Sequence, residues 1–305
     1  MELYFLGTGA GMPSKERNVT SVALTLYDER GTMWLFDCGE GTQHQMLRSP
    51  LKASRLEHIY ITHLHGDHVY GLPGLLTSRS NQGGSSPLVL FGPPGIEAML
   101  EPVLRLSQAH LAYELTIREV SEGTVFEDDR FVVVCGKLDH RIDSYGYRIV
   151  EKNKPGKLDA EKLKALGLPP GPLFGKIKRG ETVELPDGTI VDGTSFIGPP
   201  IRGKTVVILG DTRKCDTAVA LAEQADVLVH EATFDSSLND LAQAYYHSTA
   251  KDAAETARKA GAKSLLLTHI SSRYQEEDAL RLLDEARKHF PETKLAKDHW
   301  TFPVA

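Results

Sequence analysis

The hydrophobic positions of the N-terminal half form short runs that are separated by glycine-rich or charged turns. These runs predict β-strands, because each is a few residues long, rich in branched or aromatic residues and bounded by turn signals. The expected strands cover residues 3–6, 22–26, 33–36, 87–91, 115–120 and 131–134. Two other stretches have helical character: residues 96–106 place apolar side chains at helical spacing, and residues 72–79 tolerate Pro73 in a first turn.

The C-terminal half repeats this alternation. Strands are expected at 205–209, 226–229 and 264–268, and helices at about 213–223, in an alanine-rich segment and at 276–289. Ser248 or Thr249 can cap the alanine-rich helix, which should end before Gly261. Two similar halves of strands with helices predict an α/β fold, a four-layer αββα sandwich with the sheets inside and helices outside. We expect residues 1–305 to form a single domain of this type.

Residues 152–180 interrupt the pattern. Prolines and glycines break this segment into a short lysine-rich helix flanked by loops, and it holds too few large apolar residues to predict a core of its own. Its acidic residues are Asp159 and Glu161. Its basic residues are Lys152, Lys154, Lys157, Lys162, Lys164, Lys176, Lys178 and Arg179. Eight minus two is +6, so the rest of a chain of net charge -6 sums to about -12. The segment is either a solvated connector or a projecting arm that binds a polyanion.

Composition narrows the class of protein. The chain has 305 residues, 41% of them hydrophobic, which is enough for a large core. We expect neither a signal peptide nor a membrane span, because no apolar stretch approaches about 18 residues. The three cysteines, Cys38, Cys135 and Cys215, are odd in number and far apart, so we expect a reduced, cytoplasmic protein. The net charge argues against a broadly basic nucleic-acid binder.

Potential metal-binding side chains are most concentrated in residues 61–68, which follow an apolar run and contain the sequence HLHGDH. In an extended segment His63, His65 and Asp67 would face one side, and Gly66 would let the backbone fold so that His68 joins them. Imidazole and carboxylate groups are ligands of zinc-like divalent ions. Four donors within six residues, with more later in the chain, predict a site for two ions. The alternative is a histidine-rich loop that holds no metal.

Further candidate ligands follow strands elsewhere in the chain. His140, Asp211 and His269 are widely spaced, as expected for one ligand per loop around a shared cleft. Asp211 is the natural candidate for a carboxylate that bridges two ions. His230 also ends a strand, but we expect a structural role for it near the site. We assign no chemical role to the remaining histidines: His44, His58, His110, His289 and His299.

Because of these residues, the sequence resembles the metallo-β-lactamase superfamily, whose signature is HxHxDH with later His, Asp and His ligands. Within it, nearly the whole chain is similar to the ribonuclease Z family of tRNA 3′-processing endoribonucleases. The segments that carry this resemblance are GTGAGMPSKERN at 7–18, FDCGEGT at 36–42, GPLFGK at 171–176, HEAT at 230–233 and HST at 247–249.

The resemblance implies a mechanism and two zinc ions per subunit, with Mn²⁺ or Co²⁺ as possible replacements. One ion would be held by His63, His65, His140 and Asp211, and the other by Asp67, His68, His269 and the same Asp211. Asp67 would also act as the general base, and His247, oriented by Glu231, would protonate the leaving oxygen. The implied reaction is attack of a metal-bound hydroxide that removes the 3′ trailer from precursor tRNA, leaving a 3′-OH on the tRNA and a 5′-phosphate on the trailer.

The resemblance also implies how the substrate is bound. Residues 152–180 would be a flexible arm that holds tRNA, and Lys15, Arg17 and Asn18 would contact the RNA near the cut. The arm residues expected to bind are Gly171, Leu173, Phe174, Lys176, Lys178 and Arg179. A homodimer is implied, in which the arm of one subunit serves the cleft of the other.

Two alternatives stay open at the level of sequence. The HxHxDH motif is shared by hydrolases of several bond types, so the chain could be another binuclear hydrolase of the same fold, a phosphodiesterase or thioesterase. It could also be a metal-storing or RNA-binding protein without turnover.

Overall fold

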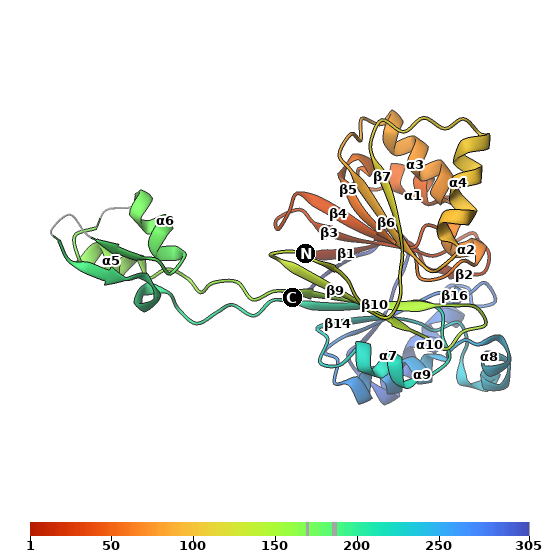
Figure 1. The fold of residues 1–305 in the computed structure, drawn as a ribbon. Coiled ribbons are helices and arrows are strands. Elements are labelled where there is room, and N and C mark those ends of the chain that lie inside the picture. The colour runs from red at the N-terminus through yellow and green to blue at the C-terminus, as the bar shows by residue number, and fades with distance from the viewer. Residues whose placement is uncertain (169–170, 185–187, 305) are drawn as a thin grey trace. The chain divides into compact units, whose positions relative to one another are not determined.

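The structure is a computed structural model that describes residues 1–168, 171–184 and 188–304. Residues 169 and 170, which belong to the predicted arm, therefore lie outside the described residues. The chain divides into two compact units (Figure 1). The larger comprises residues 1–127, 133–149 and 205–305, and the smaller comprises residues 128–132 and 150–204. Among the described residues, no helix is long and apolar enough to cross a membrane.

Two seven-stranded sheets form the centre of the larger unit. The strands of the first, in spatial order, are β18 (Thr301–Pro303), β1 (Glu2–Gly7), β3 (Ser21–Leu26), β4 (Thr32–Phe36), β5 (Leu56–Tyr60), β6 (Leu88–Gly92) and β7 (Leu115–Glu119). Those of the second are β17 (Thr293–Leu295), β15 (Leu265–Thr268), β14 (Val227–Glu231), β13 (Thr205–Leu209), β10 (Tyr145–Glu151), β9 (Phe131–Lys137) and β8 (Gly123–Glu127). A short parallel pair joins β2 (Gly9–Ala10) to β16 (Ile270–Ser271).

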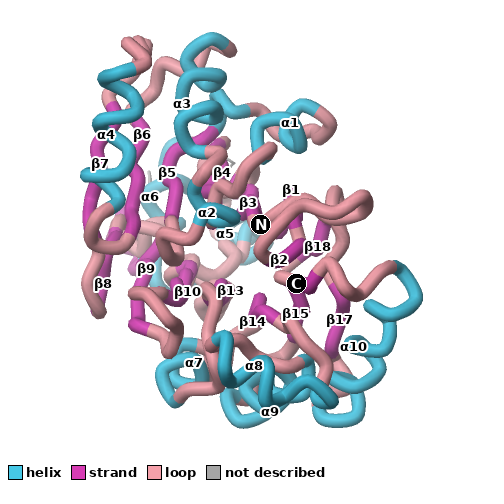
Figure 2. Tube along the Cα trace, turned by 90° about the vertical axis from the view of Figure 1, so that its right-hand side faces the viewer, coloured by secondary structure: helices cyan, strands magenta, loops and turns pink. Residues whose placement is uncertain are grey.

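Helices cover the outer face of each sheet (Figures 1 and 2). On the first sheet lie α1 (Thr42–Leu47), α3 (Leu72–Asn81) and α4 (Ile96–Leu106), whose apolar side chains share one buried cluster with the strands. On the second lie α7 (Asp216–Leu221), α8 (Asn239–Tyr245), α9 (Ala250–Ala260) and α10 (Glu276–His289), and α7, α9 and α10 contribute to a second cluster. The predicted αββα sandwich is thus confirmed. Thr249 caps α9 through a capping box, and the helix ends before Gly261 as predicted.

Aromatic side chains pack between the two sheets. Tyr60 of β5 stacks on Phe36 and Phe91 of neighbouring strands, with ring centroids 5.1 and 4.8 Å apart. Tyr147 of β10, in the other sheet, lies against the same ring and donates its hydroxyl to the carbonyl oxygen of Ile61 at 2.7 Å. This bond ties the second sheet to the end of β5, directly before the HLHGDH segment.

Strand direction brings the loops that follow β5, β13, β14 and β15 together. Strands β13, β14 and β15 are adjacent and parallel, so their carboxyl ends, which lead to Asp211, Glu231 and His269, share one edge. In the first sheet β4 and β5 are parallel as well, and they lead to Asp37 and His63. Ligands that are distant in sequence therefore meet because parallel strands end at the same edge of a sheet.

The HLHGDH segment turns at Gly66, as expected, but Asp67 does not continue the extended conformation. A short helix, α2 (Gly66–Val69), begins directly after His65, and Asp67 and His68 lie in its only turn. The bend brings Asp67 and His68 to the cluster as helical neighbours, whereas the alternation of an extended strand would have placed them on opposite sides. Extended spacing therefore applies to His63 and His65 but not to the second half of the motif.

The smaller unit contains α5 (Ala160–Ala165), α6 (Pro172–Lys178) and a hairpin of β11 (Thr182–Glu184) and β12 (Ile190–Asp192). The expectation that residues 152–180 do not form a core alone agrees with the structure. Leu163 and Ile177 from the two helices pack with Val183 and Val191 from the hairpin in one buried cluster. The two valines lie beyond residue 180, so the lysine-rich segment folds with residues that its charge pattern does not include.

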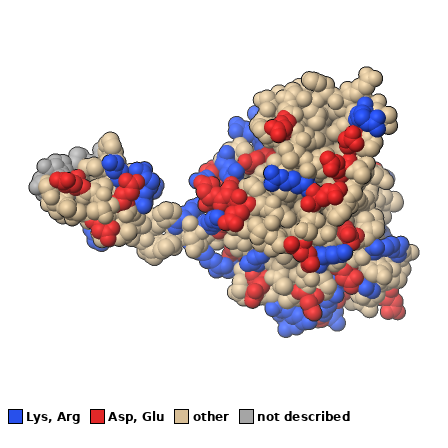
Figure 3. All heavy atoms as spheres, viewed as in Figure 1, with Lys and Arg blue, Asp and Glu red and all other residues tan. Residues whose placement is uncertain are grey.

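Charge in the smaller unit is more balanced than in its lysine-rich part. Residues 150–204 contain ten basic and seven acidic residues, a difference of +3. Four basic side chains are paired locally, in the pairs Lys154–Glu151, Lys162–Asp159, Lys164–Glu161 and Arg179–Glu181. The unit accordingly presents both signs of charge on its surface (Figure 3). Any phosphate-binding surface there must be made of the basic residues that are not paired in this way.

Candidate metal centre

Among the described residues, the seven predicted ligands form two groups of donor atoms, and a third group joins Asp211 and His269 to His247. The first group has its centre at His65. The Nδ1 atom of His65 lies 3.1 Å from Nε2 of His63 and 3.3 Å from Nε2 of His140. Oδ2 of Asp211 lies 3.5 Å from the same His63 nitrogen. Three segments that are distant in sequence thus supply the four donor atoms of this group.

The second group consists of Asp67, His68 and His269. Nε2 of His269 lies 3.3 Å from Oδ2 of Asp67 and 3.4 Å from Nε2 of His68. Oδ2 of Asp211 lies 3.3 Å from Nε2 of His269 and 3.5 Å from Nε2 of His68. A single carboxylate oxygen therefore contacts both groups, which is the position required of a bridging ligand.

These spacings match the donor set of a divalent ion. Two nitrogen or oxygen ligands about 2.0–2.1 Å from a tetrahedral zinc ion are separated by roughly 3.3 Å. Imidazole nitrogens rarely face one another at 3.1–3.4 Å in the absence of a shared proton or ion, because their lone pairs repel. The residues therefore fit the metal centre that the sequence predicts, with Asp211 common to both sets.

Hydrogen bonds to the far nitrogen orient His68 and His63. Nδ1 of His68 donates to Oδ2 of Asp37 at 2.7 Å. The Thr62 hydroxyl donates to the same carboxylate oxygen at 2.8 Å, so its own oxygen is free to accept from Nδ1 of His63 at 3.0 Å. Both rings then carry a proton on Nδ1 and direct Nε2 at the cluster. Asp37 orients one imidazole directly and the second through a threonine.

Glu231 orients two further histidines on the other side of the cluster, His269 through Thr233 and His247 directly. Its Oε2 atom accepts from the Thr233 hydroxyl at 2.6 Å, and the Thr233 oxygen accepts from Nδ1 of His269 at 2.9 Å. Its Oε1 atom accepts from Nδ1 of His247 at 2.9 Å and from the backbone N–H of Thr212 at 3.0 Å. Because Nδ1 of His247 is engaged with Glu231, it is unsuited to bind an ion, although it lies 3.8 Å from Asp211.

The backbone is unusual at three of these positions. Asp37, Tyr246 and His269 have φ angles of 58°, 62° and 55°, a left-handed region that is uncommon for residues other than glycine. At Tyr246 this conformation ends α8 and turns its carbonyl toward His140, whose Nδ1 donates to it at 2.8 Å. Backbone strain is often found where a side chain or carbonyl must be held in one functional position.

Electrostatics separate the roles of Asp67 and His247. Burial raises the pKa of Asp67, but the neighbouring His68 and His269 outweigh it and hold the pKa below its usual range, so this carboxylate is ionised. Burial lowers the pKa of His247, but the carboxylates of Glu231 and Asp211 outweigh it and raise the pKa to about 9. At neutral pH His247 is therefore protonated and can act as a proton donor.

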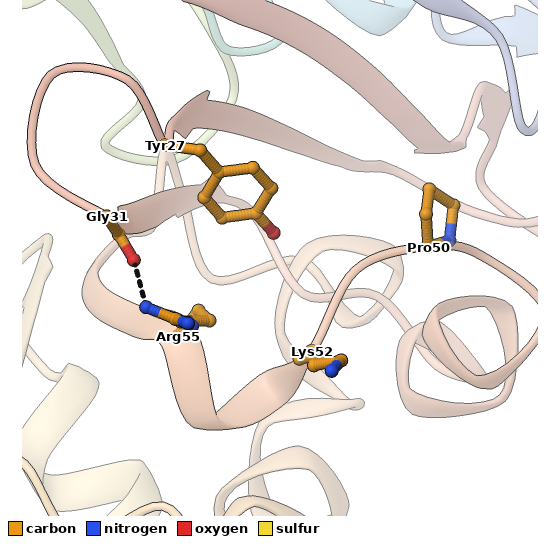
Figure 4. Close-up of a pocket in the computed structure, with 5 residues that line it drawn as sticks. All are labelled: Tyr27, Gly31, Pro50, Lys52 and Arg55. Atoms are coloured by element: carbon orange, nitrogen blue, oxygen red, sulfur yellow. Dashed lines mark hydrogen bonds between the residues drawn. The ribbon is translucent and has the colours of Figure 1, made fainter.

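A cleft of about 400 Å³ opens onto the cluster. Its walls include His65, Asp67 and His247, together with Gly11 of the N-terminal loop and Arg273 after β16. The backbone N–H of Gly11 donates to Oδ2 of Asp67 at 2.8 Å, so this loop contacts the predicted general base. Another pocket, lined by Tyr27, Gly31, Pro50, Lys52 and Arg55, contains none of the predicted site residues (Figure 4).

Within the N-terminal loop, Lys15, Arg17 and Asn18 do not line the cleft. Lys15 is exposed. Arg17 is 8% exposed, and its guanidinium donates to the Thr8 hydroxyl and to the carbonyl of Ala296, both at 2.7 Å. The Asn18 amide donates to the carbonyl of Glu40 at 2.9 Å. The burial of Arg17 argues against direct contact with RNA and assigns it to holding the loop in place.

His230 has the structural position expected of it. It is fully buried, its Nδ1 lies 2.8 Å from the carbonyl of Glu231, and it belongs to neither donor group. Four other site residues were not predicted: Asp37, Thr62, Thr233 and Arg273. Asp37 and Thr233 fall within segments 36–42 and 230–233, which carried a family resemblance but no assigned role. Thr62 directly precedes His63, and only the folded chain shows that its hydroxyl links Asp37 to His63.

The fold and the donor cluster together define the class: this is a protein of the metallo-β-lactamase fold. A family model described as a beta-lactamase superfamily domain matches residues 183–270, and one described as anti-Pycsar protein Apyc1 matches residues 1–145. A solved metallo-β-lactamase-fold protein, YhfI of Bacillus subtilis, has the same fold, with a TM-score of 0.68 and 19% identity over 99% of this chain and 98% of that one.

Full-length relatives narrow the class to a family. Ribonuclease Z of Geobacillus kaustophilus is 59% identical over 304 residues, which cover 100% of this chain and 99% of that protein. Ribonuclease Z of Bacillus licheniformis is 58% identical with the same coverage. The crystal structure of the short form of human tRNase Z (ELAC1) is similar with a TM-score of 0.74 and 33% identity over the whole of both chains. The chain belongs to the ribonuclease Z family of enzymes.

The hydrogen bonds of Asp37 predict an effect on metal affinity. Asp37→Asn keeps the shape of the side chain but removes the charge that holds the Nδ1 protons of His68 and, through Thr62, of His63. We expect zinc affinity to fall roughly 10- to 100-fold, as is typical when an outer partner of a ligand histidine is removed. Competition with a chromogenic chelator measures this directly.

Asp298→Asn is a matched control for this substitution. Asp298 is a partly buried aspartate that accepts hydrogen bonds from Thr8, Asn18 and Gln45 and from no predicted ligand. Its substitution should leave zinc affinity unchanged. Equal zinc affinity in wild type and Asp37→Asn would contradict the assignment.

Proposed function

We propose that this protein is a zinc-dependent endoribonuclease that removes the 3′ trailer from precursor tRNA, leaving a 3′-OH on the tRNA and a 5′-phosphate on the trailer. The observation that carries the proposal is the identity of 59% to a protein named ribonuclease Z over the entire chain, including residues 150–204. Shared fold alone would not distinguish this activity from other hydrolysis reactions. The same full-length relationship argues against a metal-storing or RNA-binding protein without turnover.

The two donor groups would each hold one ion: His63, His65, His140 and Asp211 for the first, and Asp67, His68, His269 and Asp211 for the second. When bound, zinc-like ions lower the pKa of water toward about 7 and neutralise charge that develops on a phosphodiester. The ligand types suit Zn²⁺ best, with Mn²⁺ and Co²⁺ as chemically reasonable substitutes.

Two side chains would move protons. Asp67 is ionised and fixed by the Gly11 amide, so it can orient the attacking water and accept its proton. His247 is protonated, lines the cleft and is held by Glu231, so it can donate a proton to the O3′ atom as that oxygen leaves. Protonation of O3′ yields the 3′-OH of the mature tRNA and leaves the phosphate on the trailer.

Arg273 suits the phosphate that enters the cleft. Its guanidinium lies 5.0 Å from the ring centroid of Phe234, and its Nε donates to the Ser271 hydroxyl at 3.1 Å. These contacts hold a cation at the cleft wall, where a guanidinium can bind two phosphate oxygens at once.

Residues 150–204 of the smaller unit would bind the tRNA body through phosphates. In the described part of the chain, Lys157 and the α6 residues Lys176 and Lys178 are exposed and form no ion pair, and the two on α6 lie on one helix, so they are the candidates for phosphate contact that we test. Arg179 is paired with Glu181. Leu173 and Phe174 pack against the small core, which assigns them to the shape of the arm, and Gly171 precedes the helix that carries the lysines. The predicted homodimer, Lys15 contact and cytoplasmic location stay predictions.

Cleavage of a precursor tRNA with a 3′ trailer tests the function. We expect one cut at the 3′ side of the acceptor stem, no cleavage when a chelator removes the metal, and recovery when zinc is restored. End-group analysis of both fragments should find the 3′-OH on the tRNA. A protein that hydrolyses small phosphodiesters or thioesters at high rate but leaves the precursor intact would support the alternative hydrolase instead.

The Glu231–His247 pair predicts a change in pH dependence. A proton donor works below its pKa, so the rate of the chemical step should fall as pH rises through the pKa of His247. Glu231→Gln removes the carboxylate that raises this pKa, so the alkaline limb of the pH–rate profile should move to lower pH. Single-turnover cleavage over a range of pH measures the limb. An unchanged limb combined with a uniformly lower rate would show that His247 is not the proton donor.

Substitutions on α6 test the arm. Lys176→Ala and Lys178→Ala should each weaken precursor binding and reduce the slope of log affinity against log salt by about 0.7–0.9 for each phosphate that the lysine had neutralised. Hydrolysis of a small phosphodiester should be unchanged. Lys164→Ala is the matched control, because this lysine is also exposed but paired with Glu161. If the three variants behave alike, α6 has no special part in binding RNA.

A further inference from the structure

Two exposed tyrosine rings lie in or near the cleft: Tyr245 lines it, and Tyr70 packs against Gly66, between two residues that line it. Tyr70 is 66% exposed and Tyr245 is 51% exposed, although large aromatic side chains are usually at least half covered in folded proteins. Neither belongs to a donor group, and neither has a part in the proton transfers described above. Both nevertheless lie beside residues that line the cleft, one following α2 and the other at the end of α8.

The ring of Tyr70 is seated on Gly66. A Cβ atom on Gly66 would lie 2.2 Å from Cε2 of the ring, so only glycine leaves space for the ring at this place. Gly66 is flanked by His65 and Asp67, which both line the cleft. The backbone between two predicted ligands therefore supports an aromatic ring from one side, while most of the ring surface stays open to solvent.

Tyr245 lines the cleft itself, in the C-terminal half of the larger unit. The guanidinium carbon of Arg141 lies 5.8 Å from the centroid of its ring. The same guanidinium donates to the carbonyl of Ala244, which restrains it beside the ring. The preceding turn of α8 adds Leu241 to the cleft wall. This part of the cleft is thus apolar and aromatic, in contrast to the charged floor.

We propose that Tyr70 and Tyr245 stack on unpaired bases next to the phosphate that is cut. The inference rests on the proposed function, because only a substrate with a single-stranded 3′ extension brings such bases to the cleft. Every base has a π-face, so stacking holds a trailer of any sequence, whereas hydrogen bonds to base edges would restrict it. The residues of the two donor groups would hold the ions and Arg273 would bind the phosphate, while the tyrosines would fix the nucleotides beside it.

Abasic substrates test this proposal through double-mutant cycles. A series of precursors, each lacking one base within a few nucleotides of the cut, is cleaved by wild type, Tyr70→Ala and Tyr245→Ala under kcat/KM conditions. Each alanine variant should lose roughly 5- to 100-fold on the intact precursor. When the missing base is the one that the tyrosine stacks on, the kcat/KM of wild type should fall by a similar factor. The kcat/KM of the matching alanine variant should then be nearly the same for the abasic and the intact precursor. Such non-additivity identifies the partner base.

Control variants separate stacking from support of the fold. Tyr70→Phe and Tyr245→Phe keep the ring and should cleave within about twofold of wild type. Tyr27→Ala removes a tyrosine of similar exposure, 43%, from the pocket of Figure 4 and should have no effect. Zinc content and thermal unfolding should be unchanged in all variants, because neither ring contacts a donor atom.

The outcomes are distinct for the two proposals. Failure of the wild type to cleave the intact precursor would overturn the proposed function and the stacking with it. If wild type cleaves normally, two results would overturn the stacking alone. One is alanine variants that are as active as wild type, and the other is losses from variant and abasic site that multiply at every position.

Discussion

The centre depends on the direction in which its imidazoles point. An imidazole can direct an unprotonated nitrogen at an ion only if its other nitrogen keeps the proton, and a hydrogen-bond acceptor must hold that proton in place. Asp37 and Glu231, which are buried and outside the donor set, provide this for three ligands, two of them through the hydroxyls of Thr62 and Thr233. The carbonyl of Tyr246 provides it for His140. Replacing any of these acceptors would loosen a ligand without touching it.

This arrangement requires the two sheets to be held in register. Asp37 and His63 follow strands of the first sheet, while Asp211, Glu231 and His269 follow strands of the second. The aromatic layer around Tyr60 and Tyr147 fills the space between the sheets, and the Tyr147 hydroxyl bonds the backbone just before the first ligands. Dense packing of this kind has few alternative arrangements, so the positions of the donor atoms follow from the core.

The donor atoms and the lysines proposed to bind the tRNA body lie in different compact units. The larger unit contains every donor atom and the proposed proton donor, while the smaller unit has its own small core. Among the described residues, four basic side chains of that unit are paired to its own acidic residues, whereas Lys157, Lys176 and Lys178 are exposed and form no ion pair, so they are the best candidates for phosphate binding. A lysine count alone therefore overstates the charge available to RNA, because ion pairs within a unit cancel part of it.

The sequence by itself determined the αββα alternation and the position of the donors, because hydrophobic period and a dense HxHxDH motif are local properties. It also determined the family, since motifs recur along almost the whole chain. Only the tertiary structure decided that Asp37, Thr62 and Thr233 orient the ligands, that Arg17 is buried, and that Val183 and Val191 complete the arm's core. Each of these depends on contacts between residues far apart in sequence or on hydrogen-bond direction, and neither can be deduced from the spacing of residue types.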